Sequence, residues 1–152
     1  MLFFFLTNVF CPFVFSGGKF RNMFAFKPLY MNKPFSYVAI PADDFERAYT
    51  FYSIITGGLI ARNENMPFPM AYFVDADHNN SGHLFQLPNF KPSGDGAIVY
   101  LKLADALDET LDKIKSAGGL VILPKTLIAP GKGYWALFLD SEGNKLALHS
   151  EI

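Results

Sequence analysis

The residues that could carry out chemistry in this chain are few, and several fall on predicted strands. The sequence has three histidines and one cysteine, Cys11, which excludes an internal disulfide and a multi-cysteine metal site. His149 could act as a general base or bind a ligand, because an unperturbed imidazole has a pKa of about 6.5. A half-exposed structural histidine is the alternative. His78 and His83 are predicted to lie at the surface, and no Ser-His-Asp or Cys-His arrangement is recognisable.

Three polar loops are predicted to be structural. The turn 75–80, DADHNN, has acids spaced as in a calcium loop, but it lacks the glycine at the sixth position and the closing glutamate. The loop 131–133, GKG, lacks the remaining glycines and the Ser/Thr of a phosphate loop. The carboxylates of the turn 140–144, DSEGN, are explained by turn chemistry alone.

The strands and helices that must position these residues belong to an internal sequence repeat with two copies. The stretch FSYVAIPADDFERAYTFYSIITGGL, residues 35–59, returns as IVYLKLADALDETLDKIKSAGGL at 98–120, so that Tyr37 aligns with Ile98. Each copy is predicted as a strand, a helix and three shorter strands. The fold class is therefore α+β, with two tandem βαβββ modules at about 34–90 and 95–152.

The predicted element boundaries follow from periodicity and capping. In the first helix Asp43 is the predicted N-cap, residues 45, 48, 49 and 52 form the apolar stripe, and Gly57 ends the helix. The strands are predicted at 35–40, 59–62, 70–74 and 83–87, and then at 97–103, 120–123, 134–139 and 144–150. Aligning Gly82 with Gly143 places four extra residues in the turn 78–81 and makes Gln86 the counterpart of Ala147.

The amino-acid composition indicates which classes of binding partner to expect. A net charge of −1 and a pI near 6.3, with no run of Lys or Arg, give no reason to expect nucleic acid. Residues 1–31 form a hydrophobic N-terminal extension with nine of the seventeen Phe and no acidic residue. We interpret it as a mis-start before Met31 or a disordered tail. The alternative is that residues 1–18 are a signal or anchor, but the apolar run is shorter than the ~20 residues that span a bilayer. Otherwise no membrane partner and a cytoplasmic location are expected.

With both copies set out, the chain resembles the vicinal oxygen chelate superfamily, which includes glyoxalase I, extradiol dioxygenases, fosfomycin-resistance enzymes and bleomycin-resistance proteins. The resemblance covers about residues 34–152. It is carried by the stretches Ile40-Pro41-Ala42-Asp43-Asp44, Arg47-Ala48, Phe51-Tyr52, Ala117-Gly118-Gly119, Gly133-Tyr134-Trp135-Ala136 and Asp140-Ser141-Glu142-Gly143-Asn144.

The resemblance implies paired modules whose strands curl into a cup-shaped mixed sheet, commonly closed by homodimerisation. It also implies four inward positions that hold a divalent metal in the family's enzymes, and here these are Tyr37, Gln86, Ile98 and Ala147. Ile98 and Ala147 have no ligating atom, and a neutral phenol or amide is a poor substitute for imidazole or carboxylate. We therefore expect no cofactor. A divalent metal would need ligands from other positions.

The same resemblance makes the inward side chains a candidate ligand pocket. An aromatic, largely apolar lining with a few hydrogen-bonding groups is typical of a small-molecule site. The expected lining is Tyr37, Tyr72, Gln86, Ile98, Tyr100, Trp135, Ala147 and His149. The alternative is that these aromatic side chains simply fill the core.

Three functions remain open from the sequence. The first is a metal-free, homodimeric protein that binds a small aromatic or amphiphilic molecule, with bleomycin-resistance proteins as the analogue. The second is a lyase or dioxygenase-like enzyme that uses a displaced metal or a Tyr37/His149 acid–base pair. The third is a non-catalytic interaction domain whose cup is filled. Whether the protein is an enzyme stays open at this point.

Overall fold

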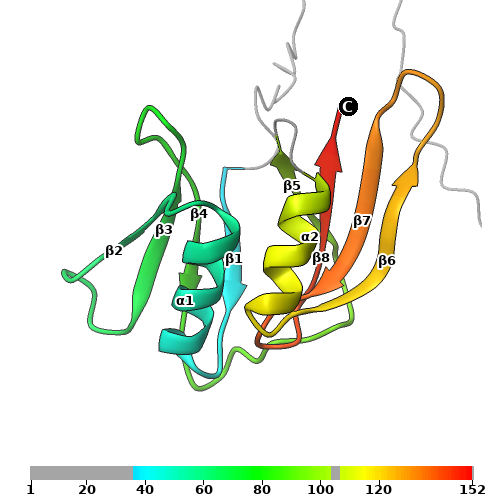
Figure 1. Ribbon diagram of the computed structural model, residues 1–152. Coiled ribbons are helices and arrows are strands. Elements are labelled where there is room, and N and C mark those ends of the chain that lie inside the picture. Colours follow the sequence, from blue (N-terminus) through cyan, green and yellow to red (C-terminus); the bar gives the residue numbers. More distant parts are fainter. Residues whose placement is uncertain (1–35, 104–106, 152) are drawn as a thin grey trace, which may run out of the picture. The chain divides into compact units, whose positions relative to one another are not determined.

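The computed structural model describes residues 36–103 and 107–151 (Figure 1). The chain divides between Asn32 and Lys33 into two units, and the described residues all belong to the second, Lys33–Ile152. The predicted extension 1–31 lies outside the described residues, so its interpretation stays a prediction.

Each half of the described chain forms one βαβββ module, as predicted. Module 1 contains β1 (Val38–Pro41), α1 (Phe45–Ile55), β2 (Ile60–Arg62), β3 (Met70–Val74) and β4 (Asn80–Phe85). Module 2 contains β5 (Val99–Leu103), α2 (Leu107–Ser116), β6 (Leu120–Leu127), β7 (Tyr134–Leu139) and β8 (Lys145–Ser150). The strand orders are β1-β4-β3-β2 and β5-β8-β7-β6, with the first pair parallel and the others antiparallel in each sheet.

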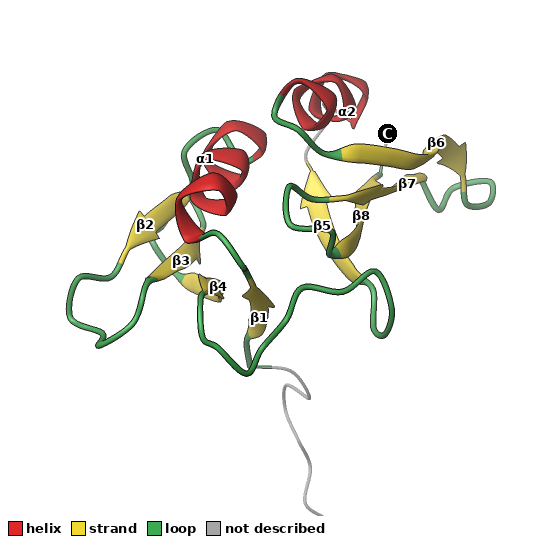
Figure 2. Cartoon of the chain, turned by 90° about the horizontal axis from the view of Figure 1, so that it is seen from below, coloured by secondary structure: helices red, strands yellow, loops and turns green. Residues whose placement is uncertain are grey.

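The two helices lie side by side and cover one face of each sheet (Figure 2). The predicted apolar stripe of α1 is buried at Phe45, Ala48 and Tyr52 but only half-buried at Tyr49, and Phe51 and Ile55 are buried in addition. The N-cap differs from the prediction. Asp44, not Asp43, accepts a hydrogen bond from the Arg47 N–H, because Asp44 is the residue with extended backbone just before the first helical turn.

Among residues 36–103 and 107–151 no helix covers the opposite face of each sheet, and we call this face the open face. Strand alternation assigns residues to the two faces. In module 1, Ile40 and Leu84 belong to the core beneath the helices, so their neighbours Ala39 and His83 lie on the open face. The same alternation places Tyr100 on the open face of module 2.

The turns between the last two strands of each module are built alike. In module 1 the Asp75 N–H donates to the Asn79 carbonyl at 3.0 Å, and in module 2 the Asp140 N–H donates to the Asn144 carbonyl at 2.9 Å. In both, the aspartate side chain accepts from backbone N–H groups two and four residues later. The turn 75–79 is therefore the counterpart of 140–144, and the predicted four-residue insertion at 78–81 is wrong.

Module 1 instead carries one extra residue, Ser81, as a β-bulge. Val74 pairs with Asn80 while Phe73 pairs with Gly82, so the ladder skips one residue of β4. β4 accordingly runs from Asn80 to Phe85 rather than over the predicted 83–87. The edge strand β6 is also longer than predicted, since it continues past Pro124 to Leu127.

No helix of residues 36–103 or 107–151 is long and apolar enough to cross a bilayer. The expected cytoplasmic location stays a prediction.

Candidate functional site

The bulge decides which residue of module 1 corresponds to Ala147. Ala147 pairs with Tyr100 on β5 and with Leu137 on β7. The residue of β4 with equivalent partners is His83, which pairs with Ala39 on β1 and with Tyr72 on β3. The prediction that Gln86 holds this position is therefore wrong by three residues, because the alignment of Gly82 with Gly143 shifts the strand.

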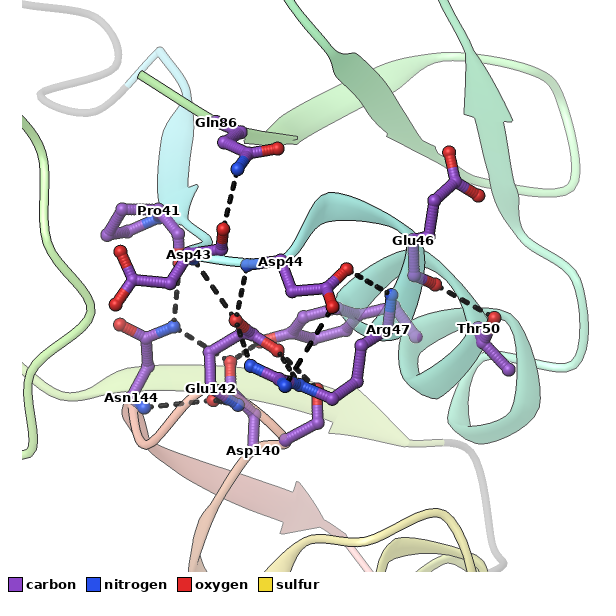
Figure 3. A network of polar contacts seen from close by, with 12 residues as sticks. Pro41, Asp43, Asp44, Glu46, Arg47, Thr50, Gln86, Asp140, Glu142 and Asn144 are labelled. Carbon is purple, nitrogen blue, oxygen red and sulfur yellow. Dashed lines mark hydrogen bonds and ion pairs between the residues drawn. The ribbon is translucent and has the colours of Figure 1, made fainter. Parts of the chain in front are cut away.

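Gln86 lies beyond the end of β4 and performs a structural task. Its side-chain amide donates to the Asp43 carbonyl at 2.5 Å (Figure 3). It thereby ties the chain after β4 to the loop before α1. The structure does not bring Gln86 together with the other residues predicted to line the cup.

The open face of module 1 places the His83 imidazole beside the Tyr72 phenol. Tyr37 immediately precedes β1 and is 63% exposed. Tyr72 lies directly across from His83 and is held by Asn63, whose side-chain amide donates to the Tyr72 hydroxyl at 2.8 Å. The His83 ring also meets Phe85, two residues further along β4, edge-on, with 5.6 Å between ring centroids.

His83 is the functional candidate that the sequence analysis missed. The sequence predicts it at the surface, but its side chain is half-buried on the open face. Burial lowers the pKa of His83, so its imidazole is neutral at pH 7 and can accept or donate a proton. The matching DxxxN turns at 75–79 and 140–144 are the signal that could have found it, since counting from these turns leads to His83 once one bulged residue is allowed.

The open face of module 2 is an aromatic platform. Tyr100 on β5 and Trp135 on β7 stack with centroids 6.2 Å apart and planes 16° from parallel. Ala147, on the strand between them, is fully buried, which is consistent with the two rings passing over β8. Ile98 at 38% exposure and Tyr100 at 52% present apolar surface outward.

His149 lies on the same face as this platform, across from Trp135. Its Nε2 atom is 3.4 Å from the Lys132 carbonyl, a long contact to the loop before β7. Tyr37 and His149, the predicted acid–base pair, belong to different modules. No contact between them is present among the described residues.

The donor set does not fit a four-ligand divalent metal site. With the corrected register, the four positions implied by the resemblance are Tyr37, His83, Ile98 and Ala147. Only His83 offers a good nitrogen ligand, and two of the four have no ligating atom. Within residues 36–103 and 107–151, no cluster of three or more His, Cys, Asp or Glu side chains gathers elsewhere.

A network of polar groups joins the two modules at the start of α1 (Figure 3). We call it the inter-module network, and its members are Arg47, Tyr52, Asp140, Glu142 and Asn144. The Glu142 carboxylate accepts from the Asp43 and Asp44 N–H groups at 3.1 and 2.9 Å. It also accepts from the Arg47 guanidinium at 2.7 and 3.0 Å.

The second part of the network is built on Asp140. The Tyr52 hydroxyl donates to the Asp140 carboxylate at 2.7 Å, and the Asn144 amide donates to the same carboxylate and to the Pro41 carbonyl, each at 2.9 Å. Burial raises the pKa of Tyr52, and the adjacent Asp140 carboxylate raises it further. Tyr52 is therefore a fixed hydrogen-bond donor.

Opposing effects set the charge of Glu142. Burial disfavours its ionised form and acts to raise its pKa, but the hydrogen bonds from Arg47 and from the Asp44 N–H outweigh burial, so the pKa of Glu142 is lowered. Glu142 is ionised at neutral pH and compensates the positive end of the α1 dipole. We therefore assign this network a structural role, that of orienting the modules.

Comparison with known proteins gives one family and one fold. The family model described as Glyoxalase/Bleomycin resistance protein/Dioxygenase superfamily matches residues 35–148. No curated protein matches the chain.

Among solved structures, a hypothetical protein of S. aureus is 21% identical with a TM-score of 0.61, over 80% of this chain and 99% of that one. A glyoxalase/bleomycin resistance protein/dioxygenase family enzyme from Burkholderia phytofirmans PsJN is 18% identical with a TM-score of 0.60, over 77% and 98%. The fosfomycin resistance protein FosX from Listeria monocytogenes is 16% identical with a TM-score of 0.60, over 79% and 94%. At these identities the likeness concerns the fold.

Proposed function

We propose that this chain, which belongs to the glyoxalase/bleomycin resistance protein/dioxygenase superfamily, binds a small aromatic or amphiphilic molecule over its open faces without a four-ligand metal site. The observation that carries the proposal is the composition of these faces. An aromatic stack on module 2 and an imidazole beside the Tyr72 phenol on module 1 offer stacking surface and hydrogen bonds together.

A second copy of the chain would complete the site. Large apolar side chains on or beside the open faces are more exposed than a monomer usually leaves them, with Tyr37 at 63%, Leu120 at 61% and Tyr100 at 52%. In the described part of the chain α1 and α2 cover only the helix side of each sheet, so a second copy would have both open faces to cover. Homodimerisation that brings module 1 of one copy over module 2 of the other would bury these residues and enclose a ligand.

The metal-free part of the proposal rests on the donor set. FosX from Listeria monocytogenes has been crystallised as a mutant complexed with Mn(II) and 1S,2S-dihydroxypropylphosphonic acid, so that relative holds a metal together with its ligand. In this chain Ile98 and Ala147 cannot contribute, and the stacked rings of module 2 take the space beside Ala147.

Metal analysis with thermal unfolding tests the proposal directly. We expect purified protein to contain well under one equivalent of nickel, zinc, iron or manganese, and its unfolding temperature to stay unchanged on adding these metals. Catechol, used as a small aromatic probe, should raise the unfolding temperature of the wild type. Tyr100→Ala should abolish that shift, whereas Ile54→Ala, an exposed apolar residue on α1, should not. One tightly bound equivalent of metal that stabilises the fold would refute the metal-free proposal.

The dimer is tested separately by sedimentation velocity. Tyr100→Glu should convert the wild-type dimer to a monomer, because a buried unpaired carboxylate is costly at an apolar interface. A monomeric wild type that shows no catechol shift would instead favour an interaction domain with filled open faces.

An acid–base enzyme is the second candidate, and His83 is the observation that favours it. A neutral, half-buried imidazole beside Tyr72 can relay a proton to a bound ligand. His83→Gln should abolish turnover of a glutathione hemithioacetal, whose isomerisation needs only proton transfer, while His78→Gln leaves it unchanged. Absence of hemithioacetal turnover by the wild type would leave binding as the function.

A further inference from the structure

We infer that the small molecule bound over the open face of module 2 is an aromatic monocarboxylate, whose ring stacks on Tyr100 and Trp135 while its carboxylate binds Lys102. This inference rests on the proposed function and names the ligand class of the same site. Strand alternation places Lys102 two residues beyond Tyr100 on β5, on the same open face and about 7 Å further along the strand. His149 on β8 is the direct partner of Lys102 in the ladder.

The charges of module 2's sheet favour an anionic ligand group. Within the described residues, its four strands contain three lysines and one histidine but no aspartate or glutamate. Strand alternation places Lys102, Lys145 and His149 on the open face. Lys125 instead pairs with Asp108 of α2 at 3.1 Å, on the helix side. A ligand stacked on the aromatic platform therefore meets lysine ammonium groups and no carboxylate from the strands.

Glu151, which follows β8, shows that a carboxylate fits beside Lys102. Its side chain accepts a hydrogen bond from the Lys102 ammonium at 2.8 Å. The hydrogen bond and the charge of Lys102 lower the pKa of Glu151, desolvation opposes them, and the charge of His149 lowers the pKa further. Two neighbouring groups of the open face thus act on the same carboxylate.

A ligand can displace Glu151 because the ion pair that holds it is exposed. The side chains of Lys102 and Glu151 are 73% and 70% exposed, and exposed ion pairs contribute little because water screens them. A ligand whose ring stacks on Tyr100 or Trp135 gains that stacking in addition to the contact with Lys102. Glu151 is therefore a weak intramolecular competitor, and the ligand carboxylate takes its place.

Trp135, the only tryptophan in the sequence, reports binding at the platform through its fluorescence. The probes are 3-phenylpropanoate, 3-phenyl-1-propanol and 3-phenylpropylamine, which share an apolar body and carry a negative, no or a positive charge at pH 7. Titration of the full chain should give saturable binding of the acid, an affinity about two- to fivefold lower for the alcohol, and a still lower one for the amine. Equal affinities for the acid and the alcohol would overturn the carboxylate assignment.

Substitutions of Lys102 and Glu151 should act in opposite directions. Lys102→Met should lower the affinity for the acid to that for the alcohol, whereas Glu151→Gln should raise it by about two- to fivefold, because the competing carboxylate is removed. Neither should change the affinity for the alcohol. The matched control Lys125→Met removes another paired lysine, on the helix side, and should leave all three affinities unchanged. Acid affinity that is unchanged in Lys102→Met, or not raised in Glu151→Gln, would overturn the inference.

These measurements separate a failure of this inference from a failure of the proposed function. Acid and alcohol that bind equally, with Tyr100→Ala abolishing both, would keep binding at the open face and remove only the carboxylate assignment. A wild type that responds to catechol but does not bind the acid would likewise overturn this inference alone. A wild type that binds neither the acid, the alcohol nor catechol would refute the proposed function and this inference with it.

Discussion

Replacing Glu142 with glutamine should weaken the contact between the two modules and lower the free energy of unfolding. The substitution removes the negative charge but keeps the shape of the side chain. The Glu142 side chain is 0% exposed and receives five hydrogen bonds, two from backbone N–H groups at the start of α1, two from Arg47 and one from the Ser141 hydroxyl. A glutamine side chain keeps one carbonyl oxygen as acceptor, but its amide N–H₂ faces donors that it cannot satisfy.

The magnitude follows from the kind of bonds that are lost. Charged hydrogen bonds contribute about 1.5–3 kcal/mol each, and a carboxylate at a helix N-terminus adds about 0.3–1 kcal/mol. Arg47 is 54% exposed, so water replaces much of its contact and its share is discounted. We expect Glu142→Gln to lower the free energy of unfolding by about 2–3 kcal/mol, and Glu142→Ala by about 3–5 kcal/mol.

Urea denaturation at pH 7 measures this loss, with Glu109→Gln as the control because Glu109 is an exposed glutamate in the first turn of α2. The pH dependence provides a second check. Since the folded pKa of Glu142 lies below its ordinary value of 4.5, its stabilisation is complete above about pH 5 and is lost as the pH falls through the folded pKa. The difference between wild type and Glu142→Gln should therefore shrink in acid. A difference below about 0.5 kcal/mol at pH 7 would refute the role assigned to the network.

Three further substitutions probe the packing around the sites. Tyr52→Phe should lower the free energy of unfolding by about 2 kcal/mol in urea titrations, because the buried Asp140 carboxylate loses its phenol donor, and an unchanged midpoint would contradict that bond's importance. His78 has a φ of 61°, so His78→Gly should raise the thermal unfolding midpoint slightly, by the equivalent of about 0.5–1 kcal/mol, whereas a lower midpoint would argue against backbone strain there. Gly133→Ala should destabilise by more than about 2 kcal/mol, since Gly133 has a φ of 77° and a Cβ there would collide with the Ser150 carbonyl. Native-like urea stability would contradict this close approach.

The modules could be predicted from the sequence because local signals agree with the fold. The apolar stripes of both helices, the glycines that end them and the repeated order of strands all depend on short-range periodicity, which a single sequence displays. The predicted start of α1 is displaced by one residue because Asp43 and Asp44 are both good caps. The backbone N–H groups of both donate to Glu142 from the other module, and no local pattern reveals such a contact.

The site could be predicted only in part, because side chains on an open face depend on strand register. Tyr37, Tyr100, Trp135 and His149 lie next to or on strands whose positions agree with the prediction. Gln86 is displaced from the site by three residues, because aligning Gly82 with Gly143 assumes four extra residues before β4 where the structure has one, the bulged Ser81. A β-bulge has no clear sequence signal, whereas the match of Gly82 with Gly143 gave a clear but incorrect one.

The two modules carry different side chains at equivalent positions of their open faces. In module 2 the position at the centre of the last strand is Ala147, buried on the open face beside the stacked Tyr100 and Trp135. In module 1 the equivalent position is His83, and its partners leave the ring half-exposed. A duplicated sheet thus carries an apolar stacking surface on one copy and a titratable group on the other. One face offers stacking surface and the other a hydrogen-bonding group, which is the combination that the proposed binding of a small amphiphilic molecule would use.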